Sequence, residues 1–162
     1  MKYQIGEKFL SYGEEFPITD VSGNIIYLVY PETFSSGHKF SFMDAKKNKL
    51  GYIVQNLNSW EPRYKIILAG VYFGEVIREG SGFKFREKFR LNICKSEFYI
   101  VKRYSWHNEY RFIRNGEVVG KASKNSLNWK DGYVVEFFDL QDHLALLSTC
   151  IAIDQVLHDI GR

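Results

Sequence analysis

The segment that most constrains the fold of this chain is its C-terminal apolar stretch, residues 142–158, which has the sequence DHLALLSTCIAIDQVLH. A helix that is hydrophobic on all sides has to be buried. This one is shorter than the roughly 20 apolar residues that a membrane span requires, and Asp154 interrupts it. We therefore predict a buried central helix over about residues 142–158, with Asp142 as its N-cap and Gly161 just past its end.

The rest of the chain predicts β-strands. Turn-forming dipeptides recur at a spacing of about 21 to 25 residues, and strand-like stretches flank each of them. The turns are Gly23-Asn24, Lys47-Asn48, Ala69-Gly70, Lys95-Ser96 and Asn115-Gly116, with a further hairpin signal at Asp131-Gly132. Gly51, Gly74 and Gly120 follow shortly after three of these turns, which indicates bulges, tight bends or close backbone approach.

This pattern predicts a mainly β protein with one buried helix. Five or six hairpins give about ten to twelve strands over residues 1–138, and a sheet of that size tends to curl or to close, which removes its exposed edges. We therefore expect a closed antiparallel barrel around the central hydrophobic C-terminal helix. A length of 162 residues fits one domain, residues 1–162.

Composition excludes several classes of protein. Hydrophobic residues make up 45% of the chain, which is enough for a large core and excludes disorder. Cys94 and Cys150 are too few for a disulfide scaffold and lie among apolar neighbours, so we expect buried, reduced thiols. The N-terminal sequence MKYQIGEKF lacks the apolar region of a signal peptide, which predicts a cytoplasmic location.

The positive charge is concentrated in the middle of the chain. The net charge is only +3, yet residues 78–114 contain ten Lys or Arg and four Asp or Glu. In residues 83–91, FKFREKFRL, basic and apolar residues alternate, so a strand would place Lys84, Arg86, Lys88 and Arg90 on one face and the Phe side chains on the other. Glu87 falls on the aromatic face, which indicates a bulge or a paired buried charge there.

Neighbouring strands extend this basic face in the prediction. Lys102 and Arg103 lie in the next strand, and Arg111 and Arg114 lie in the one after it. The candidate anion-binding residues are therefore Lys84, Arg86, Lys88, Arg90, Lys102 and Arg103. The functional interpretation is a site for anionic headgroups, phosphate or nucleic acid, and the alternative is an ordinary solvated face of a barrel strand.

Neither a metal site nor a catalytic site is predicted. His38, His107, His143 and His158 show no metal-ligand spacing, and Trp106–Tyr110, WHNEY, is not an HExxH motif. The nucleophile elbow, the P-loop and the GxGxxG motif are absent from the sequence. Asp154 is the exceptional residue of the helix: it is a functional acid, it binds backbone amides of the strands, or it marks the point where the helix leaves the barrel.

Four segments resemble the LURP-one-related family, in its bacterial, single-domain form. They are KYQIGEKFLSYGEEFPITDVSGNIIYLV (2–29), KFSFMDAKKNKLGYI (39–53), WHNEYRFIRNGEVVGKASK (106–124) and IAIDQVLHD (151–159). The resemblance covers nearly the whole chain and implies a fold like the tubby C-terminal domain and the phospholipid scramblases, with twelve strands around a central helix. Tubby-like relatives bind phosphoinositide headgroups through basic residues, but no motif of this chain matches that site.

These observations lead to three functional hypotheses. The first is a non-enzymatic cytoplasmic binding module, either free in the cytoplasm or peripheral at the membrane, that engages anionic phospholipid headgroups or a protein partner through the basic strand. The second is a protein that binds single-stranded nucleic acid, although strand parity commits the aromatic residues to the core. The third is an enzyme of unrecognised type, which the helix disfavours because it fills the space a deep pocket would need. No cofactor is predicted.

Overall fold

The computed structural model describes residues 1–6, 14–34, 37–79, 88–93, 98–104, 109–124, 132–138 and 142–160. In these ranges it contains β-strands followed by one C-terminal helix. The strands are β1 (Lys2–Ile5), β2 (Phe16–Asp20), β3 (Ile25–Phe34), β4 (Gly37–Asp44), β5 (Lys49–Gln55), β6 (Arg63–Leu68), β7 (Val71–Glu79), β8 (Lys88–Ile93), β9 (Phe98–Tyr104), β10 (Glu109–Arg114), β11 (Glu117–Lys124) and β12 (Tyr133–Phe137), and the helix is α1 (His143–Ile160).

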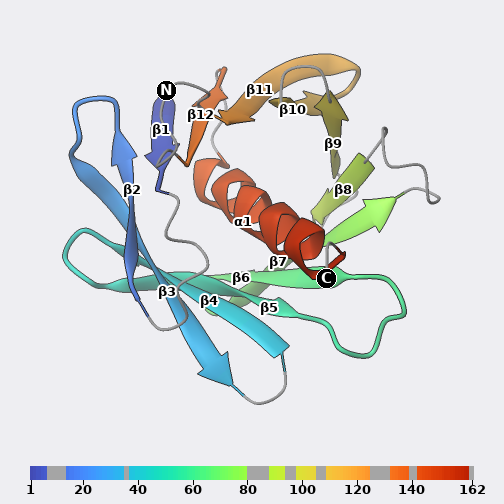
Figure 1. Cartoon of the computed structure of the whole chain (residues 1–162), viewed down its shortest axis with the longest axis horizontal. Helices are drawn as coiled ribbons and strands as arrows, with labels where there is room; N and C mark the ends of the chain where they lie inside the picture. The colour runs from blue at the N-terminus through green and yellow to red at the C-terminus, as the bar shows by residue number, and fades with distance from the viewer. Residues whose placement is uncertain are drawn as a thin grey trace.

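The strands pair in sequence order, each antiparallel to the next. The first strand, β1, pairs with β2 on one side and with β12 on the other, so the order of strands returns to its start. Figure 1 shows the strands arranged around α1, with the N-terminal strand beside β12. The predicted class, a mainly antiparallel β protein with one C-terminal helix, is confirmed.

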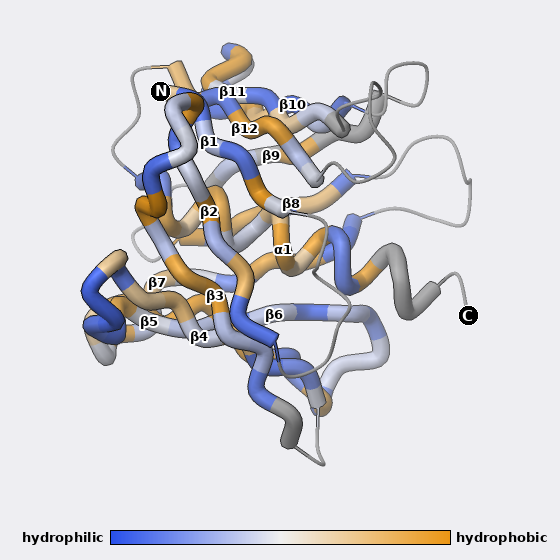
Figure 2. The backbone as a smooth tube through the Cα atoms, turned by 60° about the vertical axis from the view of Figure 1, so that its left-hand side comes forward, coloured by the Kyte–Doolittle hydropathy of each residue, from blue (hydrophilic) through white to orange (hydrophobic). Residues whose placement is uncertain are grey.

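The helix α1 is buried along the part whose side chains are described. Leu146, Leu147, Ile151 and Ala152 have no exposed surface, and Figure 2 shows apolar residues along the inner part of the helix. The helix begins where the Leu146 N–H donates to the Asp142 carbonyl at 3.1 Å. The predicted helix over residues 142–158 is thus confirmed to within two residues at its end.

The predicted repeat appears as a recurrent hairpin with a bulge. The backbone has positive φ at Gly23, Lys47, Ala69, Gly70, Asn115 and Gly116, which belong to four of the predicted turns. The predicted turns at Lys95-Ser96 and at Asp131 lie outside the described residues. Pairing slips by one residue shortly after each of the four described turns, in β2–β3, β4–β5, β6–β7 and β10–β11. In the last three, the bulge is followed by Gly51, Gly74 and Gly120, respectively.

The three strand glycines permit close approach of a neighbouring strand. A Cβ atom at Gly51 would lie 2.2 Å from the Ile67 carbonyl oxygen, and one at Gly74 would lie 2.2 Å from the Asn92 carbonyl oxygen. At Gly120 the nearest atom would be Cδ1 of Phe137, at 2.7 Å. The prediction of bulges and close approach at these residues is confirmed.

Two of the turns share one side-chain device. Asp20 accepts hydrogen bonds from the Ser22 and Asn24 N–H groups and from the Asn24 side-chain amide, each at 2.9 Å. Asp44 does the same with Lys46 and Asn48. Because these bonds favour the ionised carboxylate, led by the bond from the asparagine side chain, the pKa values of Asp20 and Asp44 lie below the usual range.

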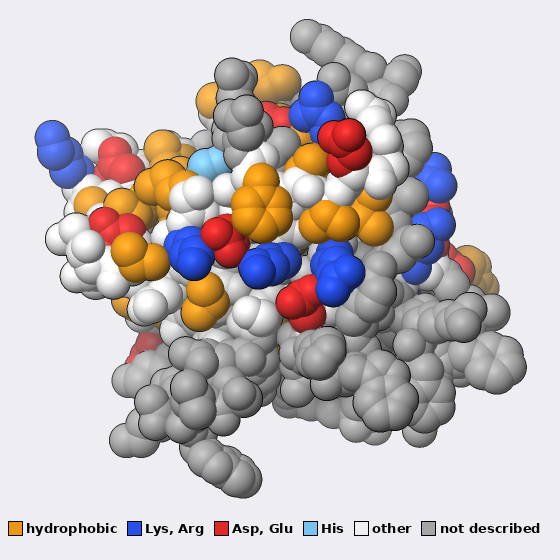
Figure 3. Space-filling view, turned by 90° about the horizontal axis from the view of Figure 1, so that it is seen from above, with side chains coloured by type: hydrophobic (Ala, Val, Ile, Leu, Met, Phe, Trp, Pro, Cys, Tyr) orange, Lys and Arg blue, Asp and Glu red, His pale blue; other side chains and the backbone are white. Residues whose placement is uncertain are grey.

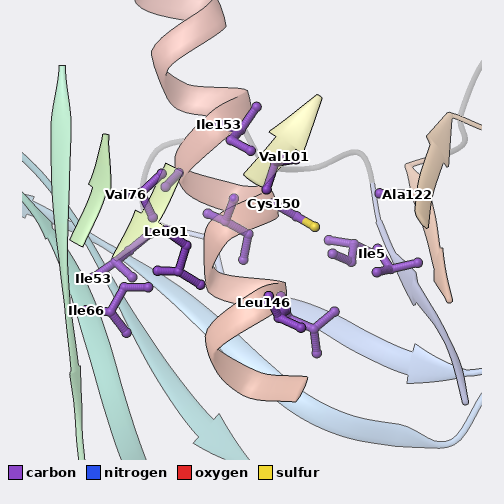
Figure 4. Packing of buried hydrophobic residues seen from close by; sticks show 14 of the residues in the cluster. Ile5, Ile53, Ile66, Val76, Leu91, Val101, Ala122, Leu146, Cys150 and Ile153 are labelled. Carbon is purple, nitrogen blue, oxygen red and sulfur yellow. The ribbon is translucent and has the colours of Figure 1, made fainter. Parts of the chain in front are cut away.

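The core lies between the helix and the inward side chains of the strands. Figure 4 shows Ile53, Ile66, Val76 and Leu91 on one side of α1, with Ile5 and Ala122 on the other. The backbone of α1 approaches β5, β6 and β7 most closely. On the β10–β12 side the larger side chains of Tyr110, Phe112, Tyr133 and Phe137 occupy the space between strand and helix.

Candidate anion-binding surface

The predicted basic strand is described only in its second half. In β8, Phe89 and Leu91 are fully buried, whereas Lys88 and Arg90 have about three-eighths of their side chains exposed. The prediction that the basic side chains point outward and the apolar side chains point inward is therefore confirmed for residues 88–91. Lys84 and Arg86, with Phe83, Phe85 and Glu87, lie outside the described residues.

Register across four strands places basic residues directly opposite one another. Lys88 of β8 pairs with Lys102 of β9, Lys102 pairs with Arg111 of β10, and Arg111 pairs with Lys121 of β11. We call these four residues the basic row. Lys121 in turn pairs with Glu136 of β12, and Glu136 pairs with Lys2 of β1.

The described members of the basic row are open to solvent. The exposed fractions of the side chains are 38% for Lys88, 40% for Arg111 and 44% for Lys121. Figure 3 looks onto the face that carries part of this row and shows basic and acidic side chains along a line across it. These cations are thus accessible to a ligand in solution or at a surface.

Three carboxylates partly neutralise this surface. Glu79 forms ion pairs with Lys88, whose Nζ lies 3.2 Å from Oε2, and with Arg90, whose Nε lies 2.5 Å from Oε1. Arg111 Nε lies 2.6 Å from Glu109 Oε1. Glu136 lies 3.7 Å from both Lys121 and Lys2, one to each carboxylate oxygen. Two of the three carboxylates are therefore shared between two cations, and the surface keeps an excess of positive charge.

This arrangement opposes stability. Like charges directly opposite one another on one face of a sheet are destabilising, and the basic row has three such pairings in succession. Exposed ion pairs contribute only about 0–1 kcal/mol each, so the shared carboxylates offset little of the repulsion. A ligand that brings negative charge to the row would relieve it.

Two predicted basic residues do not belong to this row. Arg103 pairs with Tyr110, a buried residue, so its register position is one residue away from the row. Arg114 donates from Nη1 to the Tyr99 hydroxyl at 3.2 Å, and Tyr99 donates to Asp142 at 3.2 Å. Arg114 is therefore part of a hydrogen-bonded chain that ends beside the start of the helix.

Sequence reasoning missed Lys121. It lies in residues 115–162, where acidic residues outnumber basic ones, so no local pattern marks it as part of a basic surface. Only the register of β10 with β11, which includes the slip between Phe112 and Ile113, brings Lys121 opposite Arg111.

Asp154 makes a polar contact between the helix and β12. Tyr133 donates its hydroxyl to Asp154 Oδ1 at 2.9 Å, so a tyrosine of β12 is one partner of this carboxylate. Burial and the nearby Asp154 charge raise the pKa of Tyr133 well above its usual value. With Tyr110 and Cys150, these residues line a cavity of about 10 Å³, roughly the room that one water needs.

Cys150 is 8% exposed, which confirms the expected buried thiol. Burial, followed by the charge of Asp154, raises the pKa of the Cys150 thiol. A raised pKa lowers the thiolate fraction at neutral pH, so the residue is a poor nucleophile. Cys94 lies outside the described residues.

Comparison with known proteins identifies the family. The model of the LURP-one-related family matches residues 1–154. The chain belongs to the LURP-one-related family. A relative from Bacillus subtilis (strain 168), described as uncharacterized protein YxjI, is 27% identical over 153 residues, which cover 94% of this chain and 91% of the relative. No solved structure matches the chain.

The LURP-one-related match spans every strand and most of the helix, and so includes the basic row, Tyr133 and Asp154. In the part of this family member that the structure describes, no group of three or more His, Cys, Asp or Glu side chains is placed to hold a metal. Within the same residues, no helix is both long enough and apolar enough to span a membrane.

Proposed function

We propose that this LURP-one-related protein is a non-enzymatic binding module whose basic row engages anionic phospholipid headgroups. The observation that carries the proposal is the succession of Lys88, Lys102, Arg111 and Lys121 across four paired strands. Neighbouring strands lie about 4.8 Å apart, so a single phosphate-bearing group is within reach of two or more of these residues. A site of this kind suits a peripheral protein at a cytoplasmic membrane surface.

Packing inside the described strands supports binding in place of catalysis. Among the residues that the structure describes, the helix and the aromatic side chains pack against the inner faces of the strands, and the cavity beside Asp154 has room for about one water. Most enzymes use a pocket several tens of times larger. We therefore assign ligand binding to the outer face, which carries the basic row.

Single-stranded nucleic acid is the second candidate, because the basic row would attract any polyanion. Sequence-tolerant binding of single strands also uses exposed aromatic side chains for stacking on the bases. In β8–β10 the described aromatic residues Phe89, Tyr99, Tyr110 and Phe112 are buried. Phe138, just past β12, exposes its ring, but a single ring does not provide a series of stacking positions for successive bases. This observation favours a headgroup over a base.

Vesicle flotation tests the proposal. The parent protein and the variant Arg111→Glu/Lys121→Glu are mixed with vesicles of phosphatidylcholine alone or with 30 mol% phosphatidylserine, at low and at physiological salt. We expect binding to the anionic vesicles only, a loss of at least tenfold in the variant, and weaker binding at high salt.

The matched control is Lys46→Glu/Lys65→Glu. Both of its residues are exposed and lie outside the basic row, in the β4–β5 turn and in β6, and the change in net charge is the same. Binding that falls equally in the two variants would show a general charge effect and contradict the proposed site. Equal binding of the parent to neutral and anionic vesicles would contradict the proposed ligand.

A further inference from the structure

An apolar row lies directly beside the basic row. Two residues further along the same strands, Ile100 of β9 pairs with Ile113 of β10, and Ile113 pairs with Val118 of β11. The Phe138 N–H, just past β12, donates to the Val119 carbonyl at 2.9 Å. We define the apolar row as Ile113, Val118 and Phe138, with Ile100 at the corresponding register position of β9.

Two side chains of the apolar row are open in the described chain. Val118 is 46% exposed and Phe138 is 43% exposed, and Ile113 is partly exposed. Val119, the neighbour of Val118, packs against the core. In Figure 3 apolar side chains form a band beside the line of charged ones on this face. Neighbouring apolar side chains that are left open beside cations mark an interaction surface more clearly than isolated exposed residues do.

An apolar row beside a basic row favours a lipid bilayer over a soluble phosphate compound as the ligand. A free phosphate or a phosphorylated metabolite would use the basic row and would gain nothing from Val118 and Phe138. A bilayer surface offers both components, because its phosphates lie above the boundary between headgroups and acyl chains. A protein that lies in the interface buries its apolar side chains about 5–10 Å into that boundary.

The spacing of the rows fits this partner. Two residues along a strand correspond to about 7 Å, so both rows can contact one bilayer surface at the same time. In β11 the bulge brings Val118, and not Val119, opposite Ile113.

We infer that the outer face of β10–β12 rests on an anionic bilayer, with Val118 and Phe138 inserted at the headgroup boundary and the basic row on the lipid phosphates. This inference rests on the proposed function and adds to it the source of the phosphate and the orientation of the protein. It follows that the apolar row contributes to vesicle binding and not to binding of a soluble polyanion.

The test compares two ligands on the same variants. Val118→Ser/Phe138→Ser removes the apolar row without a change in charge, and Leu57→Ser/Val71→Ser is the control, because both control residues are exposed elsewhere on the molecule. Each protein is titrated with vesicles containing 30 mol% phosphatidylserine and, separately, with inositol hexakisphosphate. We expect the first variant to lose at least tenfold in vesicle binding with inositol hexakisphosphate binding unchanged, and the control to match the parent.

The outcomes separate the two proposals. Vesicle binding that survives loss of the apolar row, but not charge reversal of the basic row, would overturn the bilayer insertion and keep the headgroup site. Binding of inositol hexakisphosphate or of an oligonucleotide without vesicle binding would overturn the insertion and the lipid headgroup together. Binding that is insensitive to the basic row would overturn the proposed function itself.

A variant that should bind vesicles more strongly completes the test, because unfolding would weaken binding and could not produce this result. Val118→Phe enlarges the apolar row at an exposed residue and should strengthen vesicle binding several-fold, with inositol hexakisphosphate binding unchanged. The melting temperatures of all variants should stay within a few degrees of the parent, since surface substitutions usually change stability by about 0.5 kcal/mol or less. Weaker or unchanged vesicle binding by a folded Val118→Phe variant would contradict the inference.

Discussion

The strands β5–β7 and the strands β10–β12 surround the same helix in different ways. The β5–β7 side approaches the helix backbone closely and contributes Ile53, Ile66 and Val76 to the core, together with the buried ring of Tyr64. The β10–β12 side presents Tyr110, Phe112 and Tyr133, includes the hydrogen bond to Asp154, and encloses a small cavity. On its outer face, only the second side contributes to the paired basic and apolar rows.

This difference separates the residues that hold the fold together from those that serve binding. Close aliphatic packing stabilises the β5–β7 side and leaves its outer face without a run of opposed like charges in the described register. The β10–β12 side tolerates an internal cavity and an external row of like charges, both of which are unfavourable for stability. Residues that oppose stability and recur in one region are candidates for function.

The largest expected effect is loss of the fold on Ile151→Asp, because Ile151 is fully buried in the helix between the two sides. An unpaired buried charge costs several kcal/mol, against a total stability of about 5–15 kcal/mol. We expect no folded protein by circular dichroism, whereas Val71→Asp, at an exposed residue, should fold. A folded Ile151→Asp variant would show that the helix is not the centre of the core.

The next effect compares packing on the two sides. Ile66→Ala on β6 and Ile153→Ala beside the cavity remove the same atoms from buried residues. Substitutions of this kind cost about 2–5 kcal/mol, and we expect Ile66→Ala near the top of that range and Ile153→Ala near the bottom, because Ile153 already borders empty space. Urea denaturation measures both. Equal losses would remove the distinction between the sides.

A smaller effect is expected from Tyr133→Phe, which removes the hydroxyl that Asp154 accepts at 2.9 Å. Both side chains are partly buried, and a hydrogen bond to a charged group contributes about 1.5–3 kcal/mol. The variant should be less stable than the parent at pH 7 by an amount in that range, with the fold unchanged by circular dichroism. Stability equal to that of the parent would mean that the Tyr133–Asp154 bond does not hold the β10–β12 side to the helix.

The smallest effect concerns the turn that begins the β5–β7 side. Because hydrogen bonds from Asn48 lower the pKa of Asp44 below 3.8 in the folded state, the ionised carboxylate stabilises the fold above pH 3.8, and this contribution is lost as the pH falls through the lowered pKa. Asp44→Asn should therefore lower the melting temperature slightly at pH 7, and the difference from the parent should disappear in acid. A difference that grows in acid would contradict this assignment.

Local signals were sufficient for several elements. The turns at Gly23, Lys47, Ala69 and Asn115, the glycines that follow the bulges, and the helix were all predicted, because each depends on residues close together in the chain or on a long apolar run. The alternation of basic and apolar residues likewise predicted which side chains of residues 88–91 are buried and which are exposed. The candidate site was predicted only in part. Lys88 and Lys102 belong to the basic row, and Arg90 shares Glu79 with Lys88. Arg103 does not belong to the row, and Lys84 and Arg86 lie outside the described residues.

The sequence by itself determined the alternation of strands and turns, the burial of the C-terminal helix and the concentration of positive charge in residues 78–114, since all three follow from short-range pattern or composition. Only the tertiary structure decided which basic residues face one another. Lys88 and Lys121 are far apart in the chain, and a shift of one residue in any of three strand pairings would move Lys121 out of the row. Register, which depends on bulges and on packing against the helix, therefore determines the proposed binding surface.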